Sequence, residues 1–224
     1  MKDAYTKSSV DVIKELNSST DGLTDEEASI RLEKYGLNEI ERTKQKTILE
    51  MIVEQLKDKM ILILLLASIL SFLLGEYAEG IVILVIIFIN AIISIIQEKK
   101  ALDAIDALRN MNAHYTTVIR GGKKKNILTK NVVVGDIVYL EDGNIVPADM
   151  RLIEENGLKV DESSLTGESV PVEKDANGIL DENTTLADRV NMVYSSTIIS
   201  YGTALGVVTA TSKDTEVGSI ATML

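Results

Sequence analysis

The chain has 224 residues, a formal net charge of −11, no cysteine and one histidine, His114. Without cysteine it cannot form disulfides or thiolate metal sites, and one histidine excludes a multi-histidine zinc site and leaves a serine–histidine–aspartate triad one possible base. The negative charge argues against nucleic acid as a partner, because phosphate binding requires a basic surface.

Residues 1–46 predict a small helical element. In SSVDVIKEL a serine precedes apolar residues at helical spacing, and LTDEEASIRLEKYG places Thr24 three residues before Glu27. This spacing is a capping box, and Gly36 provides a helix-ending signal. We expect an N-terminal helical element with its own start and stop signals.

Residues 47–100 predict an amphipathic helix followed by a membrane hairpin. The segment TILEMIVEQLKDKM (47–60) has a helical apolar stripe, and we expect it to lie at the membrane interface and run into the first span. Sixteen residues from Met60 and seventeen from Gly80 then carry no charge. A spanning helix needs about 17–25 apolar residues, so we expect two transmembrane helices, at about 57–75 and 80–98.

The charges beside these runs predict the orientation. Two lysines precede the first run and two follow the second, whereas the link between the runs carries Glu76 and Glu79. By the positive-inside rule both soluble portions face the cytoplasm. We therefore expect a multi-pass protein of the lipid bilayer, in the cell membrane if the source is bacterial. Small polar residues in the spans, such as Ser68 and Asn90, should form hydrogen bonds between neighbouring helices. Neither apolar run contains a charged residue, so we expect no ion-binding site on this hairpin.

Residues 101–224 predict a β domain after the helix, which we expect to continue to about Met111. HYTTVIRGGKKKNIL places Gly121-Gly122 between two strand-like arms, which is a two-residue hairpin signal. Short Val- and Ile-rich strands follow, separated by turns every eight to twelve residues. This pattern favours a β-sandwich or small barrel. The fold class is thus an α + β membrane protein.

Glu168 is the candidate catalytic residue, within DESSLTGESVPVEK (161–174). A carboxylate held on a glycine turn between strands can be presented to a partner site, where it orients or deprotonates a water. An acid in a polar turn is, however, usually just solvated. The residues alone leave both interpretations open and favour the solvated acid. The sequence contains neither GxxxxGK[ST] nor GxGxxG, the common phosphate-binding patterns.

A set of ordered motifs resembles the P-type (phosphoenzyme-forming) cation-transporting ATPases. VGDIV (134–138), VPAD (146–149) and DESSLTGESVPVEK resemble their jelly-roll-like actuator domain. GLTDEEASIRLEKYGLNEI resembles their N-terminal element, and ILLLASILSFLLGEYAEG their first span and its outer loop. The resemblance covers nearly the whole chain and is greatest to calcium pumps of the endoplasmic-reticulum and bacterial type.

The resemblance implies a mechanism. In such pumps ATP phosphorylates an aspartate in a DKTGT motif, and actuator rotation then brings the TGES loop to the aspartyl phosphate. Glu168 would position and activate the attacking water, while Thr166, Gly167 and Ser169 would shape the loop. The chain would supply no cofactor-binding residue and no metal ligand, and ATP and Mg²⁺ would be cofactors of the full-length pump.

The expected role is the N-terminal part of an ATP-driven pump, with Ca²⁺ as the transported cation. DKTGT is not among these residues, so the phosphorylation, nucleotide-binding and later transmembrane portions would be partners of this chain, which alone would be inactive. One alternative is a non-catalytic membrane protein that binds or regulates a full-length pump. Another is a membrane-anchored hydrolase that uses Glu168 by itself.

Overall fold

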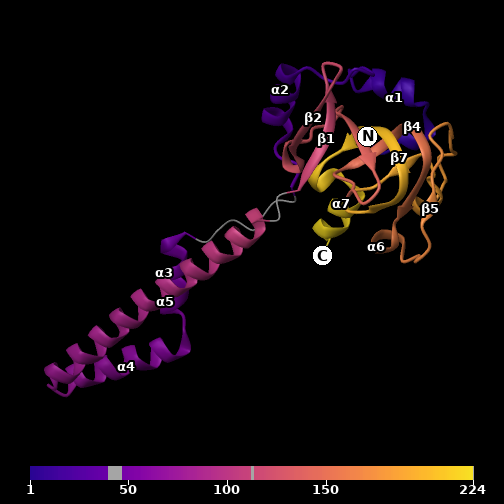
Figure 1. Ribbon diagram of the computed structural model, residues 1–224. Coiled ribbons are helices and arrows are strands. Elements are labelled where there is room, and N and C mark those ends of the chain that lie inside the picture. The colour runs from indigo at the N-terminus through magenta and orange to yellow at the C-terminus, as the bar shows by residue number, and fades with distance from the viewer. Residues whose placement is uncertain (40–46, 112–113, 224) are drawn as a thin grey trace. The chain divides into compact units, whose positions relative to one another are not determined.

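The computed structural model describes residues 1–39, 47–111 and 114–223, and the chain divides into two compact units (Figure 1). The first unit contains residues 1–41 and 113–224, and the second contains residues 42–112. The boundary expected at residue 46 lies outside the described residues.

The first unit begins with a 3-10 turn, η1 (Ala4–Thr6), and two helices, α1 (Ser9–Glu15) and α2 (Asp25–Tyr35). The Ser8 side chain accepts a hydrogen bond from the Asp11 amide and so caps α1. The predicted capping box is confirmed, because Thr24 Oγ1 accepts from the Glu27 amide while the Glu27 carboxylate accepts from the Thr24 amide. Gly36 ends α2 with a φ of 80°, as its position predicted.

The rest of the first unit is an antiparallel sheet with short helices. The described strands are β1 (Tyr115–Arg120), β2 (Lys123–Leu128), β3 (Ile137–Glu141), β4 (Asp149–Asp161), β5 (Val172–Glu173), β6 (Met192–Val193) and β7 (Ile198–Ala210). They form one seven-stranded sheet in the order β2-β1-β3-β7-β4-β5, with β6 paired to β4. The helical elements are η2 (Thr129–Asn131), α6 (Ser163–Thr166), η3 (Leu186–Asp188), η4 (Ser212–Asp214) and α7 (Glu216–Met223). The predicted β domain is therefore confirmed as an antiparallel sheet with helices.

The Gly121-Gly122 hairpin is also confirmed. Arg120 pairs with Lys123 across the turn, and both glycines have positive φ, 58° and 70°. A two-residue turn with positive φ at both positions follows the twist of the flanking strands, and glycine adopts it without steric cost.

The sheet buries apolar side chains on both faces, because successive residues point in opposite directions. Val138 and Val208 belong to the cluster formed by Met150, Leu152, Leu158 and Val160, whereas Ile137 and Val207 pack with Tyr194 and with the N-terminal residues Tyr5, Val12 and Ile13. The N-terminal segment therefore covers one face of the sheet.

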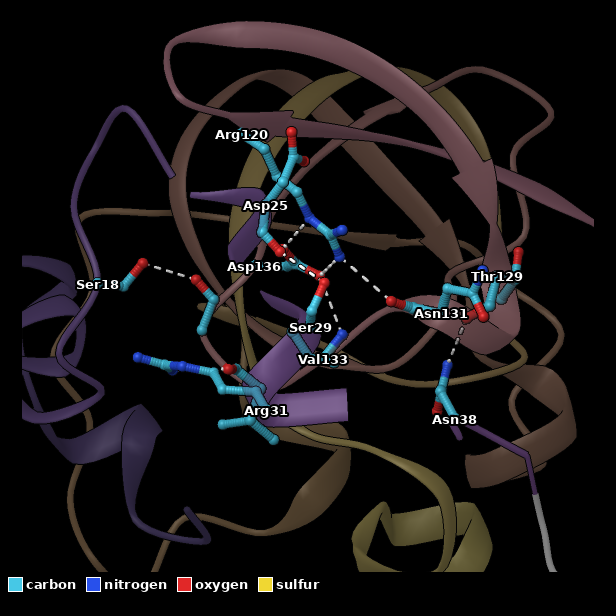
Figure 2. Close-up of polar contacts among 12 residues, drawn as sticks. Ser18, Asp25, Ser29, Arg31, Asn38, Arg120, Thr129, Asn131, Val133 and Asp136 are labelled. Carbon is cyan, nitrogen blue, oxygen red and sulfur yellow. Dashed lines mark hydrogen bonds and ion pairs between the residues drawn. The ribbon is translucent and has the colours of Figure 1, made fainter. Parts of the chain in front are cut away.

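Polar contacts to backbone carbonyls fix residues 1–39 onto the β domain. Ser18 Oγ donates to the Gly135 carbonyl at 2.6 Å, and Arg31 donates to the Val134 carbonyl at 2.8 Å; Ser18 and Arg31 are labelled in Figure 2. Asn38 Nδ2 donates to the Thr129 carbonyl at 3.2 Å in the same view. These contacts join the segment after α1, helix α2 and the segment after α2 to the connection between β2 and β3.

The aspartate of VGDIV is buried at this contact. Asp136 is fully buried, and Arg120 approaches its two carboxylate oxygens at 2.8 and 2.7 Å (Figure 2). The Val133 amide also donates to this carboxylate, at 2.9 Å. Such a two-pronged arginine–carboxylate contact fixes geometry as well as charge, so Asp136 holds the turn before β3.

The second unit contains three helices, α3 (Ile48–Leu56), α4 (Lys59–Leu73) and α5 (Tyr77–Met111). The prediction that the amphipathic helix runs into the first span is wrong. The Asp58 side chain accepts hydrogen bonds from the Met60 and Ile61 amides and so starts α4 as a separate helix. The predicted continuation of the last helix to Met111 is confirmed.

One described helix is long and apolar enough to cross a membrane, through its segment Tyr77–Ala104. α4 has 15 residues, which at 1.5 Å per residue is about 22 Å, shorter than a hydrocarbon core of roughly 30 Å. The two helices pack through small groups: buried Ser68 donates to the Gly80 carbonyl at 3.0 Å, as expected of a small polar residue between helices.

Candidate functional site

The TGES residues lie in the connection between β4 and β5. These strands pair antiparallel, with Lys159 opposite Glu173 and Val160 opposite Val172. The connection leaves β4 at Asp161, whose side chain accepts from the Ser163 amide at 2.9 Å, and forms the single turn α6. The pairing of β4 with β5 thus holds both ends of this short loop.

Hydrogen bonds within the loop fix the backbone up to Glu168. Thr166 Oγ1 donates to the Glu162 carbonyl at 3.1 Å and accepts from the Glu168 amide at 3.3 Å. Gly167 has a left-handed φ of 80°, and its amide donates to the Ser163 carbonyl at 3.0 Å. Glycine suits this conformation because a side chain would strain it. Thr166 and Gly167 therefore define where the chain presents Glu168.

Ser163, Ser164 and the continuous stretch from Gly167 to Pro171, which includes Glu168 and Ser169, are the exposed parts of the loop. Within the described ranges, no side-chain hydrogen bond or ion pair engages the Glu168 carboxylate or the Ser169 hydroxyl. Val170 is 74% exposed beside them. Since its backbone is held and its carboxylate is free, Glu168 can act on a group that another surface brings to it.

A buried ion pair lies at the base of the loop. Lys174 Nζ is 2.6 Å from Glu162 Oε1, and the two side chains are 0% and 1% exposed. Burial raises the pKa of Glu162 and lowers the pKa of Lys174, because it disfavours both charged forms, while each charge opposes the shift of the other. The pair joins the residue before α6 to the residue after β5.

The acid of the VPAD motif has a structural environment. Asp149 of VPAD is 4% exposed, and its carboxylate accepts from the Ser195 amide at 2.9 Å and the Glu216 amide at 2.7 Å. Burial raises its pKa to about 6, against the lowering effect of these two hydrogen bonds. Asp149 thus holds the start of α7. Asp149 and Asp136 are both buried, whereas Glu168 is exposed.

The described residues contain no group of three or more histidine, aspartate or glutamate side chains that could hold a metal ion. The arrangement therefore offers a single exposed carboxylate on a supported loop, which fits proton transfer or orientation of a water.

Comparison with known proteins identifies the family. The model of the P-type ATPase actuator domain matches residues 110–224, which is half of the chain. The chain belongs to the P-type ATPase family. A second model, the N-terminus of cation transporters and ATPases, matches residues 4–71. The two matches place the TGES loop within the actuator domain and helices α1 to α3 within the N-terminal region of this family of pumps.

The relatives are longer than this chain. A calcium-transporting ATPase of Listeria monocytogenes is 43% identical over 98% of this chain and 25% of the relative, and one of Lactococcus lactis is 42% identical over the same shares. A sodium/potassium exporting P-type ATPase of Saccharomyces cerevisiae is 39% identical over 92% of the chain and 19% of the relative. The chain thus spans about a quarter of the length of its bacterial relatives.

The sequence interpretation missed the Glu162–Lys174 pair, although both residues lie in the quoted stretch DESSLTGESVPVEK. Isolated charges beside turns are normally solvated, so their residue types gave no sign of burial. Their positions could have predicted the pair, because the two residues lie on opposite sides of the loop and next to residues that pair between β4 and β5.

Proposed function

We propose that this chain is the actuator, N-terminal element and first membrane hairpin of an ATP-driven cation pump, with Ca²⁺ as the transported ion. The bacterial calcium-transporting relatives support the choice of ion. The remainder of such a pump would supply the phosphorylated aspartate, the sites for ATP and Mg²⁺, and the ion ligands.

The exposed carboxylate of Glu168 on its braced loop is the observation that carries this proposal. In the proposed step, the water oxygen bonds to phosphorus, the bond from phosphorus to the aspartyl oxygen breaks, and Glu168 accepts a proton from the water. The aspartate leaves as its carboxylate and the phosphate is released. Thr166 and Gly167 hold the backbone that carries Glu168, and Ser169 extends the exposed surface of the loop.

The proposed membrane hairpin consists of α4 and α5. Large apolar side chains stay exposed along both helices, including Leu66, Leu70, Leu73, Phe88 and Ile92, and only 11% of the most apolar window of α5 is buried. Lipid is the environment that would cover such surfaces, and the lysines that flank the hairpin support a cytoplasmic location for both soluble portions. The shorter helix α4 would reach the interfaces through its first residue, Lys59, and through the flanking residues Lys57, Asp58 and Leu74 to Glu76.

A chimeric pump tests the role of Glu168. Residues 1–224 replace the matching quarter of the Listeria monocytogenes relative, and the phosphoenzyme formed from radiolabelled ATP is followed after a chase. Glu168→Gln removes the proton acceptor but keeps the side-chain size, so phosphoenzyme should form normally and decay about 100-fold more slowly. Glu173→Gln, an exposed acid on the neighbouring strand β5, is the matched control and should decay like the unmodified chimera.

A further inference from the structure

We propose that the buried Glu162–Lys174 ion pair is a positioning device that sets where the TGES loop presents Glu168. This proposal rests on the proposed function of Glu168, and it assigns roles to two residues that contact neither water nor phosphate in that function. Both are positioning residues.

The place of the pair in the loop is the first support. Glu162 immediately precedes α6, and its carbonyl accepts hydrogen bonds from the Leu165 and Thr166 amides and from Thr166 Oγ1. Thr166 in turn accepts from the Glu168 amide. A displacement of Glu162 would therefore pass through Thr166 to Glu168.

The other partner is attached to the sheet. Lys174 follows β5, and its amide donates to the Leu158 carbonyl on β4 at 3.0 Å. Its ammonium group then crosses the base of the loop to the Glu162 carboxylate at 2.6 Å. The pair links the outgoing and returning arms of the loop independently of the two residue pairs of the β4–β5 ladder.

The exclusiveness of the contact is the second support. Apart from each other, the Glu162 carboxylate and the Lys174 ammonium have no hydrogen-bond partner in the described part of the chain, and both are buried. Each charge is therefore compensated by the other alone. A buried pair of this kind strongly resists separation, because moving one partner leaves the other charged and desolvated. The separation of the two arms is thereby held at one value.

The consequence concerns one step of the reaction. Glu168 acts only when the phosphoenzyme is hydrolysed, so a misplaced loop should slow that step and leave phosphorylation by ATP intact. A purely structural role would instead lower the amount of folded, phosphorylatable pump without changing the decay of each phosphoenzyme.

Two variants of the chimeric pump test the proposal. Lys174→Met breaks the pair and leaves a buried carboxylate, whereas the double variant Glu162→Met, Lys174→Met removes both charges and keeps the interior filled, which protects folding. In both we expect phosphoenzyme to decay at least about tenfold more slowly per phosphorylated site, since small displacements of a reacting group cost up to about 100-fold. The exchanged pair Glu162→Lys, Lys174→Glu should recover part of the lost rate.

Glu168→Gln in the same chimera separates the two proposals. If Glu168→Gln slows decay and the double variant decays like the unmodified chimera, the pair does not position the loop and the proposed function stands. If Glu168→Gln itself leaves decay unchanged, the proposed function fails, and the role of the pair fails with it. Slow decay in all three variants, with unchanged rates of phosphorylation, is the result expected.

Discussion

Arg151 is the side chain whose replacement should most disturb the actuator domain. It is 1% exposed, and its guanidinium donates to five backbone carbonyls, those of Lys7, Leu152, Ala176, Gly178 and Asn191. These carbonyls belong to the N-terminal segment, to β4 and to the segment between β5 and β6. One side chain thus joins three parts of the chain.

The cost of Arg151→Met follows from the carbonyls that lose their donor. Two of these carbonyls keep another donor, because the Asn191 side chain donates to the Gly178 carbonyl and the Leu152 amide donates to the Asn191 carbonyl. In the described part of the chain, no donor other than Arg151 reaches the carbonyls of Lys7 and Ala176. Each such loss costs about 1–3 kcal/mol. Removing a desolvated guanidinium, whose pKa burial lowers to about 10, offsets part of this. We expect a net loss of about 2–4 kcal/mol.

Amide hydrogen exchange of the chain in detergent micelles measures this loss locally. The Leu180 amide donates to the Tyr5 carbonyl and the Asp175 amide to the Val190 carbonyl, so both report on the segment that Arg151 ties down. Their exchange should accelerate by about 30- to 1000-fold in Arg151→Met, because 1.4 kcal/mol corresponds to tenfold. Amides between β3 and β7 should change least.

Arg189→Met is the matched control. The Arg189 guanidinium lies 3.9 Å from the centre of the Tyr5 ring and 3.6 Å from the Glu216 carboxylate, with its side chain 17% exposed. Partly solvated contacts of this type contribute about 1 kcal/mol or less. Equal exchange in Arg151→Met and the unmodified chain would refute the role assigned to the buried guanidinium.

Two further predictions concern the N-terminal element and the membrane hairpin. A side chain at Gly22 would place its Cβ 1.8 Å from the Ile119 carbonyl oxygen, so Gly22→Ala should detach residues 1–39 from the sheet and admit protease there. Gly36 has nearly the same positive φ as Gly22, but a Cβ added there would have no atom within 4 Å. Gly36→Ala should therefore cost only about 1 kcal/mol of backbone strain. For topology, single cysteines can be introduced because the chain has none. An impermeant maleimide should label Glu76→Cys from outside intact cells and Ser9→Cys only after lysis, and the reverse pattern would contradict the proposed orientation.

Local signals in the sequence predicted the parts of the fold that local chemistry determines. Thr24 and Glu27 form the capping box because both partners lie within one turn, and Gly121-Gly122 forms the hairpin turn because positive φ is required there. The long helix also reaches Met111 as its apolar spacing predicted. In each case the residues that decide the structure are neighbours in the chain.

The break between α3 and α4 shows where such signals compete. The apolar stripe of residues 47–60 continues past Lys57, which favoured one helix, yet Asp58 accepts two amide hydrogen bonds as the cap of α4. An aspartate is among the strongest helix-starting residues, because its carboxylate satisfies amides that the first turn leaves unpaired. Periodicity alone therefore gave the wrong boundary.

Buried charges could not be predicted because their partners are distant in sequence or determined by packing. Arg151 reaches the carbonyl of Lys7 through the docking of the N-terminal segment, and Glu162 finds Lys174 only after β5 pairs with β4. Glu168 is the opposite case. Its exposed position agrees with a solvated turn acid as well as with a catalytic one, and the motifs around it, together with family membership, support the catalytic role.

The decay of the phosphoenzyme in the chimeric pump tests the central proposal most directly. After a chase with unlabelled ATP, labelled phosphoenzyme in Glu168→Gln should persist about 100-fold longer than in the Glu173→Gln control, with equal amounts formed at the start. Equal decay of the two variants would contradict the assignment of Glu168 as the residue that activates the attacking water.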